Sequence, residues 1–122
     1  MLRGHRDLKV FQLAYRLAMQ VFHESMPFRK KSATRLLTRF GVLLEASSNI
    51  AEGFRKRRYP KMFISKFADA DGESSETQVW LDFARDCGYL GAGPYAELTA
   101  GYEEVGKMLG SMIAHPEKFR AL

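Results

Sequence analysis

Apolar residues recur three or four positions apart along most of the chain, which is the spacing of one face of an α-helix. Between the stretches that carry this pattern lie Met26-Pro27, Tyr59-Pro60 and a glycine-rich run at 88–94. Proline and glycine interrupt helices, and no alternation typical of β-strands occurs. The pattern therefore predicts four helices, at residues 7–24, 32–58, 60–87 and 94–114.

The second stretch organises the rest of the chain. Its core face is predicted to be formed by Leu36, Leu37, Phe40, Leu43, Leu44, Ser47, Ile50, Ala51 and Phe54. Ser32 is a suitable N-cap for this helix. Gly53 lies near its end, and it either terminates the helix or lets another segment approach closely.

The third stretch has a heptad-like seam, because its inward positions alternate four and three apart. Its members are Phe63, Phe67, Ala70, Ser74, Thr77, Leu81 and Ala84. A second stripe beside the seam holds Asp69, Gly72, Glu73, Glu76 and Trp80. Small seam residues let helix axes come close, and glycine at 88 can cap the helix.

The first and fourth stretches complete the helical pattern. Asp7 is a candidate N-cap for the first, whose apolar face is Leu8, Phe11, Ala14, Tyr15, Ala18, Val21 and Phe22. The fourth presents Tyr95, Leu98, Tyr102, Val105, Leu109, Met112 and Ile113. We expect the last six residues to be frayed. Short connections favour antiparallel neighbours, so the sequence predicts one all-α domain over 1–122, an up-down-up-down four-helix bundle.

Charge is distributed unevenly along the chain. Residues 29–66 hold eleven basic and two acidic residues, a net charge of +9, whereas residues 69–104 hold one basic and nine acidic residues, a net charge of −8. Such a chain can bind a polyanion through its basic region, or bind copies of itself, basic surface to acidic surface. Both interpretations stay open at this point.

The basic residues at both ends of the second helix are candidates for phosphate contacts, which would give salt-sensitive and sequence-independent affinity. This predicted set is Arg29, Lys30, Lys31, Arg35, Arg39, Arg55, Lys56, Arg57, Arg58 and Lys61. The alternative is an ordinary solvated surface. Phe54 and Tyr59 flank the second cluster and could stack on bases, although core packing explains Phe54 better.

Carboxylates recur on the second and third helices. Glu45, Asn49 and Glu52 share one face, and further acidic residues share a face of the third helix. Di-iron bundles require Glu-x-x-His pairs, and none of these glutamates is followed by such a histidine. We therefore expect no catalytic residue, metal or cofactor, and expect Asn49 and Glu52 to hydrogen-bond or pair with arginines, within the bundle or across a subunit contact.

The single cysteine, Cys87, excludes an intrachain disulfide and fits a reducing compartment. We expect it to be a buried, inert thiol. The first residues do not resemble a secretory signal, and no segment approaches the ~18 consecutive apolar residues of a membrane span. The sequence thus favours a cytoplasmic protein that does not contact membranes.

Three blocks of the chain resemble one known family. They are Asp7-Leu8-Lys9-Val10-Phe11-Gln12-Leu13-Ala14 with Leu17-Ala18, then Asn49-Ile50-Ala51-Glu52-Gly53, and then Ala70, Gly72, Glu76, Ala84 and Gly88-Tyr89. On these residues the chain is identified as a member of the bacterial four helix bundle protein family. That family was first noticed in intervening sequences of large-subunit ribosomal RNA genes and was mislabelled for a time as a ribosomal protein. Ala46-Ser47-Ser48 departs from it by lacking the proline that usually precedes the second block.

The resemblance implies a four-helix protomer that assembles into a homopentameric ring, with no known enzymatic activity. Asn49, Glu52, Gly53, Gly72 and Glu76 are the residues of the family motifs. One branch of the family is the accessory variability determinant of diversity-generating retroelements, whose members bind a reverse transcriptase and are basic enough to bind RNA or DNA. The sequence therefore favours a non-enzymatic, oligomeric nucleic-acid-binding accessory protein. The alternative is a protein-interaction scaffold whose charge serves only ring assembly.

Overall fold

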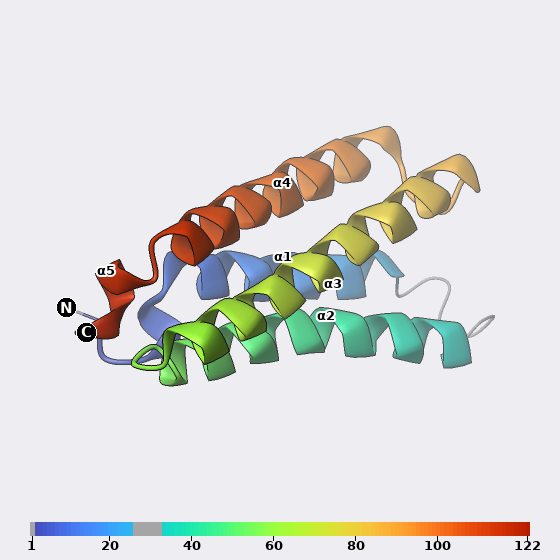
Figure 1. Cartoon of the computed structure of the whole chain (residues 1–122). Coiled ribbons are helices and arrows are strands. Elements are labelled where there is room, and N and C mark those ends of the chain that lie inside the picture. Colours follow the sequence, from blue (N-terminus) through green and yellow to red (C-terminus); the bar gives the residue numbers. More distant parts are fainter. Residues whose placement is uncertain (1, 26–32) are drawn as a thin grey trace.

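The computed structural model describes residues 2–25 and 33–122, and side chains for residues 2–25 and 41–122. A 3₁₀ helix, η1 (His5–Asp7), precedes four long helices and one short one. Their bounds are α1 Lys9–Ser25, α2 Ala33–Arg55, α3 Pro60–Asp86, α4 Ala92–Ala114 and α5 Glu117–Arg120. Successive long helices run antiparallel, and α1 and α3 each contact both α2 and α4 (Figure 1). The described residues therefore form the predicted all-α four-helix bundle.

The seam predicted for α3 is confirmed residue by residue. All seven members, from Phe63 to Ala84, are buried. Phe63 and Phe67 stack with ring centroids 4.4 Å apart, and the Thr77 hydroxyl donates to the Glu73 carbonyl at 2.9 Å. Because a helix repeats its faces regardless of what surrounds it, the spacing alone was sufficient to identify the inward side.

The other helices differ from the expected faces at two positions. Tyr15 is 54% exposed and Leu44 is 52% exposed, although both follow the helical period. The predicted core members of α4 from Leu98 to Met112 are buried, as are Leu43, Ile50 and Phe54 of α2. Leu36, Leu37 and Phe40 lie outside the described side chains.

The N-terminal boundary of α1 corrects a prediction. Asp7 does not cap α1, because its Oδ2 accepts the backbone N–H of Arg3 at 2.7 Å. Leu8 has extended backbone angles and separates η1 from α1. Ser32, the predicted cap of α2, lies outside the described residues.

The second helix is shorter than predicted. It ends at Arg55 rather than Arg58, and residues 56–58 form a turn. The Lys56 N–H is shared between the carbonyls of Glu52 and Gly53, and the Arg57 N–H donates to Phe54. Such i to i−3 bonds tighten the last turn of a helix and end it.

The end of α3 and the end of the chain are each held by specific contacts. Gly88 has a φ of +78°, and the N–H groups of Tyr89 and Leu90 both donate to the Ala84 carbonyl, so glycine caps α3 as predicted. Of the last six residues, expected to be frayed, the first four form α5. The ring of Phe119 stacks on Phe63 at 5.8 Å, which holds α5 against the bundle.

Gly53 allows close packing rather than ending α2. A Cβ built at Gly53 would lie 2.5 Å from Cε1 of Phe67 and 3.1 Å from Cβ of Lys66. The missing side chain therefore lets the ring of Phe67 lie directly against the backbone of α2. None of the helices in the described ranges is both long and apolar enough to span a membrane.

Candidate functional site

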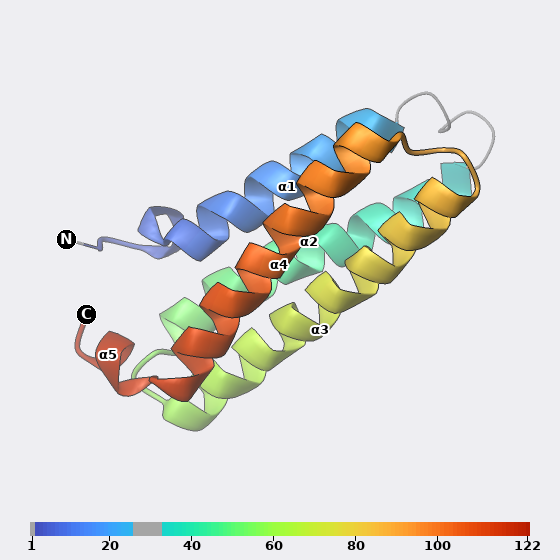
Figure 2. The ribbon, with the colours of Figure 1, turned by 90° about the horizontal axis from the view of Figure 1, so that it is seen from above.

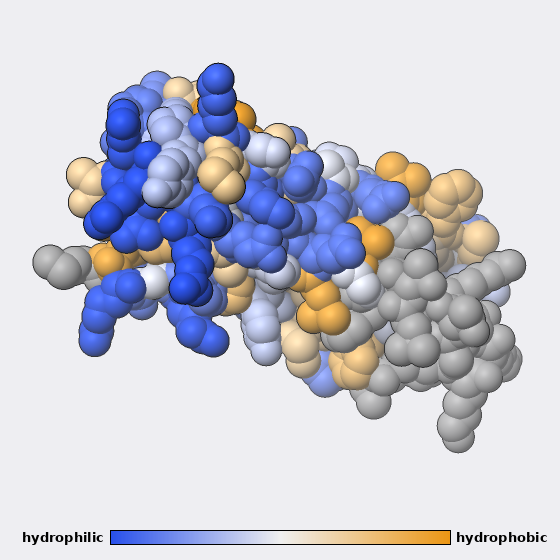
Figure 3. All heavy atoms as spheres, turned by 60° about the horizontal axis from the view of Figure 1, so that its bottom comes forward, coloured by the Kyte–Doolittle hydropathy of each residue, from blue (hydrophilic) through white to orange (hydrophobic). Residues whose placement is uncertain are grey.

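Three segments remote in sequence meet at one end of the bundle. The turn between α2 and α3 lies there beside η1 and α5 (Figures 1 and 2). Residues 2–8, 55–61 and 117–122 together contain nine basic and two acidic residues. Hydrophilic side chains cover most of this end in Figure 3, at the left of the view. We call it the basic end.

Four cations form the centre of the basic end, and we call them the basic turn. They are Arg55, Lys56, Arg58 and Lys61, and all four are exposed. Within the described part of the chain, none of them makes an ion pair. Cations without carboxylate partners are free to bind external anions, so this is the structural feature most suited to phosphate contacts.

Arg57 differs from its neighbours because it is engaged within the fold. Its guanidinium carbon lies 4.4 Å from the ring centroid of Phe54. Its Nε donates to the Leu122 carbonyl at 2.7 Å, and a terminal nitrogen donates to the Phe54 carbonyl at 3.1 Å. Arg57 thus ties the end of α2 to the C-terminal segment, and a substitution here would disturb packing as well as charge.

The other half of the predicted basic set precedes α2 in the sequence or belongs to its beginning. Arg29, Lys30 and Lys31 lie outside the described residues. Arg35 and Arg39 belong to the first two turns of α2, and their side chains are likewise outside. Since α2 has 23 residues, its two ends are ~34 Å apart at ~1.5 Å per residue. One protomer therefore holds two separated basic regions.

Sequence reasoning missed four cations of the basic end. Arg3, Arg6, Lys118 and Arg120 are exposed, and they come from the N-terminal segment and α5. They were not predicted because they lie far apart along the chain, and no local pattern links residues 3 and 120 to residue 58. The antiparallel topology was the available signal, because it places the start of the first helix and the end of the fourth beside the turn between the second and third.

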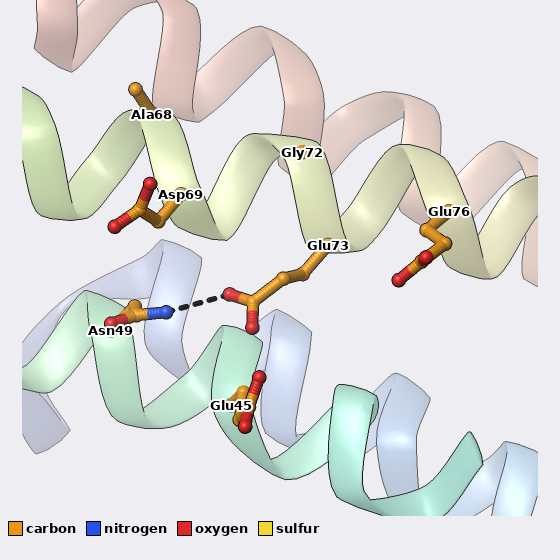
Figure 4. A pocket seen from close by; sticks show the side chains of 7 residues that line it. All are labelled: Glu45, Asn49, Ala68, Asp69, Gly72, Glu73 and Glu76. Atoms are coloured by element: carbon orange, nitrogen blue, oxygen red, sulfur yellow. Dashed lines mark hydrogen bonds between the residues drawn. The ribbon is translucent and has the colours of Figure 1, made fainter. Parts of the chain in front are cut away.

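A second charged surface lies along α2 and α3. It is an open groove of about 540 Å³, and its lining residues are Glu45, Asn49, Ala68, Asp69, Gly72, Glu73 and Glu76. The Asn49 amide donates from Nδ2 to Oε1 of Glu73 at 2.7 Å. In Figure 4 the Glu73 side chain extends from α3 toward Asn49 and Glu45 of α2. We call this surface the acidic groove.

Glu73 is the most perturbed carboxyl of the acidic groove. Its pKa is raised from 4.5 to about 7 by partial burial and by the nearby carboxyls of Glu45 and Asp69, which together outweigh the opposing hydrogen bond from Asn49. Burial and like charges both disfavour the ionised form. Near neutral pH this carboxyl is therefore divided between its protonated and ionised forms.

Within the described protomer, the family-motif residues Asn49 and Glu52 have partners other than arginines. Asn49 bonds to Glu73, and Glu52 pairs with Lys66 of α3 at 2.9 Å, which raises the pKa of Lys66. These residues face α3, whose nearby side chains are a carboxylate and a lysine. The motif therefore joins α2 to α3: Asn49 and Glu52 supply polar contacts, and Gly53 supplies close packing. Gly72 and Glu76 line the same groove.

The structure places the residues considered for metal binding, nucleophilic chemistry and base stacking. No group of three or more His, Cys, Asp or Glu side chains in the described ranges is arranged to hold a metal ion. Cys87, expected to be buried, is exposed, because it follows the last turn of α3 after Ala84, the last buried member of the seam. Phe54 is 3% exposed and covered by Arg57, so it serves the core.

Comparisons with known proteins give one match. Neither the curated proteins nor the solved structures include a significant match to this chain. A family model described as 23S rRNA-intervening sequence protein matches residues 6–111, a range that includes all three sequence blocks, the whole of α1, α2 and α3, and α4 as far as Ser111. The chain therefore belongs to the 23S rRNA-intervening sequence protein family.

Proposed function

We propose that this protein is an oligomeric accessory protein that binds RNA or DNA through its basic end. The observation that carries the proposal is the basic turn, where four exposed cations make no ion pair with the described residues. Each cation that meets a phosphate releases condensed counterions, so affinity would be sequence-independent and would fall with salt. The proposal assigns no reaction to the chain.

Other cations of the basic end extend the same surface. Arg3 and Arg6 belong to the N-terminal segment and η1, and Lys118 and Arg120 belong to α5, at the same end of the bundle (Figure 1). A footprint of several cations supports binding to a backbone rather than to one phosphate, because the contacts add along the strand. Asp7 and Glu117 are the acidic residues of these segments.

We also propose the homopentameric ring that the family resemblance implies. The opposite charges of the acidic groove and of a neighbouring copy's basic residues would orient a head-to-tail contact, and exposed apolar side chains such as Phe83 would hold it together. Such a contact closes into a ring when the rotation permits. A ring would place several basic ends around one axis and raise avidity for a long strand. If the charge asymmetry serves assembly alone, the protein is a scaffold instead.

A reverse transcriptase is the proposed protein partner, by resemblance to the accessory proteins of diversity-generating retroelements. The neighbouring genes provide the direct test. A reverse transcriptase gene with template and variable repeats beside this one would support the role, and co-purification of the two proteins would follow. A neighbourhood without these elements would remove this part of the proposal and leave nucleic-acid binding unaffected.

The experiment that tests nucleic-acid binding is fluorescence anisotropy of labelled RNA and DNA hairpins between about 50 and 300 mM salt. Arg58→Glu should weaken binding about tenfold and reduce the salt slope, because it reverses one cation of the basic turn. Arg16→Glu is the matched control, since Arg16 is exposed in the middle of α1 and changes net charge equally. We expect the control to remain within about twofold of wild type.

Two results would contradict the proposal. Absence of binding at the lowest salt would leave the charge asymmetry as an assembly device. Equal losses in the two variants would show that net charge, rather than the basic turn, determines affinity. Circular dichroism of both variants checks that the helices are retained.

A further inference from the structure

Tyr59 is an exposed aromatic residue at the centre of the basic turn. Its side chain is 61% exposed, and Arg58 precedes it while Lys61 follows two residues later. Phe119, another aromatic residue of the basic end, is partly buried and stacked on Phe63. Because the ring of Tyr59 is mostly exposed, unlike that of Phe119, packing in the core does not explain why an aromatic residue occupies position 59.

The backbone around Tyr59 is held on both sides. Its N–H donates to the Lys56 carbonyl at 2.8 Å, and its carbonyl accepts the N–H of Phe63 at 3.0 Å. Tyr59 occupies the N-cap position of α3 with extended angles (φ −116°, ψ 90°). An exposed ring on a fixed backbone loses little conformational freedom on binding, which favours a contact role.

The neighbourhood of the ring combines cations with apolar surface. Met62, one helical turn into α3, is 46% exposed. Lys56 and Lys61 are exposed on either side. Single-stranded nucleic acid presents both matching features, since its phosphates bind cations and its unpaired bases stack on aromatic rings. The bases of a duplex are already stacked on one another and offer no face to an isolated side chain.

We propose that the basic end prefers single-stranded nucleic acid to duplex, with Tyr59 as the residue on which an unpaired base stacks. This inference rests on the proposed function and adds the substrate class to it. Cations of the basic turn would bind the phosphates of the nucleic acid, and the Tyr59 ring would discriminate between single strand and duplex. Stacking accepts any base, so the preference would be for strandedness rather than for sequence.

The test compares two labelled probes with equal numbers of phosphates, an oligothymidylate of about 24 nucleotides and a blunt DNA hairpin whose loop is a polyether linker without bases. Wild type should bind the single strand more tightly. Tyr59→Ala should weaken single-strand binding about tenfold and leave hairpin binding and both salt slopes unchanged. Tyr59→Phe should bind as wild type, because the ring is retained.

Tyr89 provides the matched control. It is 60% exposed and lies in the turn after α3, at the opposite end of the bundle. Tyr89→Ala should leave both affinities unchanged, which separates a local effect from the general loss of an exposed tyrosine. Circular dichroism verifies that each variant is folded.

The possible failures are distinguishable. If wild type binds strand and hairpin equally, or if Tyr59→Ala has no selective effect on the strand, the stacking inference is wrong while the proposed function stands. If wild type binds neither probe at about 50 mM salt, the proposed function itself fails, and the inference fails with it. Binding to anionic vesicles in place of both probes would also overturn the two together.

Discussion

At position 53 the chain has no room for a side chain. The Phe67 ring occupies the space that a Cβ would need, and Lys66 lies close beside it. Gly53 belongs to the motif that the sequence singled out, but its neighbours show what the glycine provides. It brings α2 against the ring of a fully buried phenylalanine, and this contact lies one turn from the basic turn.

We predict that Gly53→Ala destabilises the protein by about 1–3 kcal/mol, the usual cost of overpacking a core. The added methyl would force the Phe67 ring to move. Gly110→Ala is the control, because a Cβ at Gly110 has no neighbour within 4 Å. It should stabilise α4 by ~0.5–1 kcal/mol through helix propensity. Urea unfolding at one fixed protein concentration measures both, and equal effects of the two changes would refute the packing explanation.

At the scale of elements, α2 and α3 are joined by two polar contacts on one side of their interface. These are the Asn49–Glu73 hydrogen bond and the Glu52–Lys66 ion pair. Both partners of the ion pair are substantially exposed, so that pair adds little stability. Glu73 is different, because partial burial and the facing carboxyls of Glu45 and Asp69 raise its pKa to about 7.

This raised pKa predicts a pH dependence of stability. Folded Glu73 holds its proton more tightly than the unfolded chain, whose carboxyl has a pKa near 4.5. Its favourable contribution is therefore complete below about pH 4.5 and is lost as the pH rises through about 7. After allowance for solvent screening we expect a loss on the order of 1 kcal/mol.

Glu73→Gln should remove this part of the pH dependence and stabilise the protein at pH 8. The amide carries no charge and keeps an oxygen that can accept the Asn49 hydrogen bond. Glu103→Gln, at an exposed position of α4, should leave the pH profile unchanged. Denaturant midpoints measured from pH 5 to pH 8 test this, and parallel profiles for wild type and Glu73→Gln would show that the carboxyl is not titrating as expected.

At the scale of the whole molecule, part of the exposed apolar surface lies away from the basic end. The basic end is at one end of the bundle, whereas two large apolar side chains are exposed on the C-terminal half of α3. Phe83 is 65% exposed, the highest value among the large apolar side chains that the structure describes, and Val79 one turn earlier is 53% exposed. Exposed apolar residues of this kind are suited to contacts between copies.

We predict an assembly of five chains of 13.9 kDa, with a mass of about 70 kDa by light scattering. Because apolar contacts are not screened by salt, this mass should stay constant from about 50 to 300 mM salt while nucleic-acid affinity falls. Phe83→Ser should lower the mass if α3 contributes to the contact. A wild-type mass near that of one chain would exclude the ring, and a mass that falls with salt would indicate that charge holds the copies together.

The sequence by itself determined the helices and their inward faces. Helical period and helix breakers are local properties, so the α3 seam could be read without knowing its neighbours. Local patterns were less informative at the edges of elements, where Asp7 bonds to Arg3 instead of capping α1 and where Phe119 orders the last residues by stacking on Phe63. The family resemblance, carried by three blocks of residues, was likewise available from the sequence.

Only the tertiary structure decided which charged residues act together. It places Arg3, Arg6, Lys118 and Arg120 at the same end of the bundle as the basic turn (Figure 1). Arg57 is engaged in contacts within the fold, whereas Tyr59 is exposed among the cations. The tertiary structure also placed Glu45 against Glu73, which no spacing along the chain indicates. Pairing, burial and pKa depend on distances through space between segments far apart in sequence, and those distances are fixed only when the four helices pack.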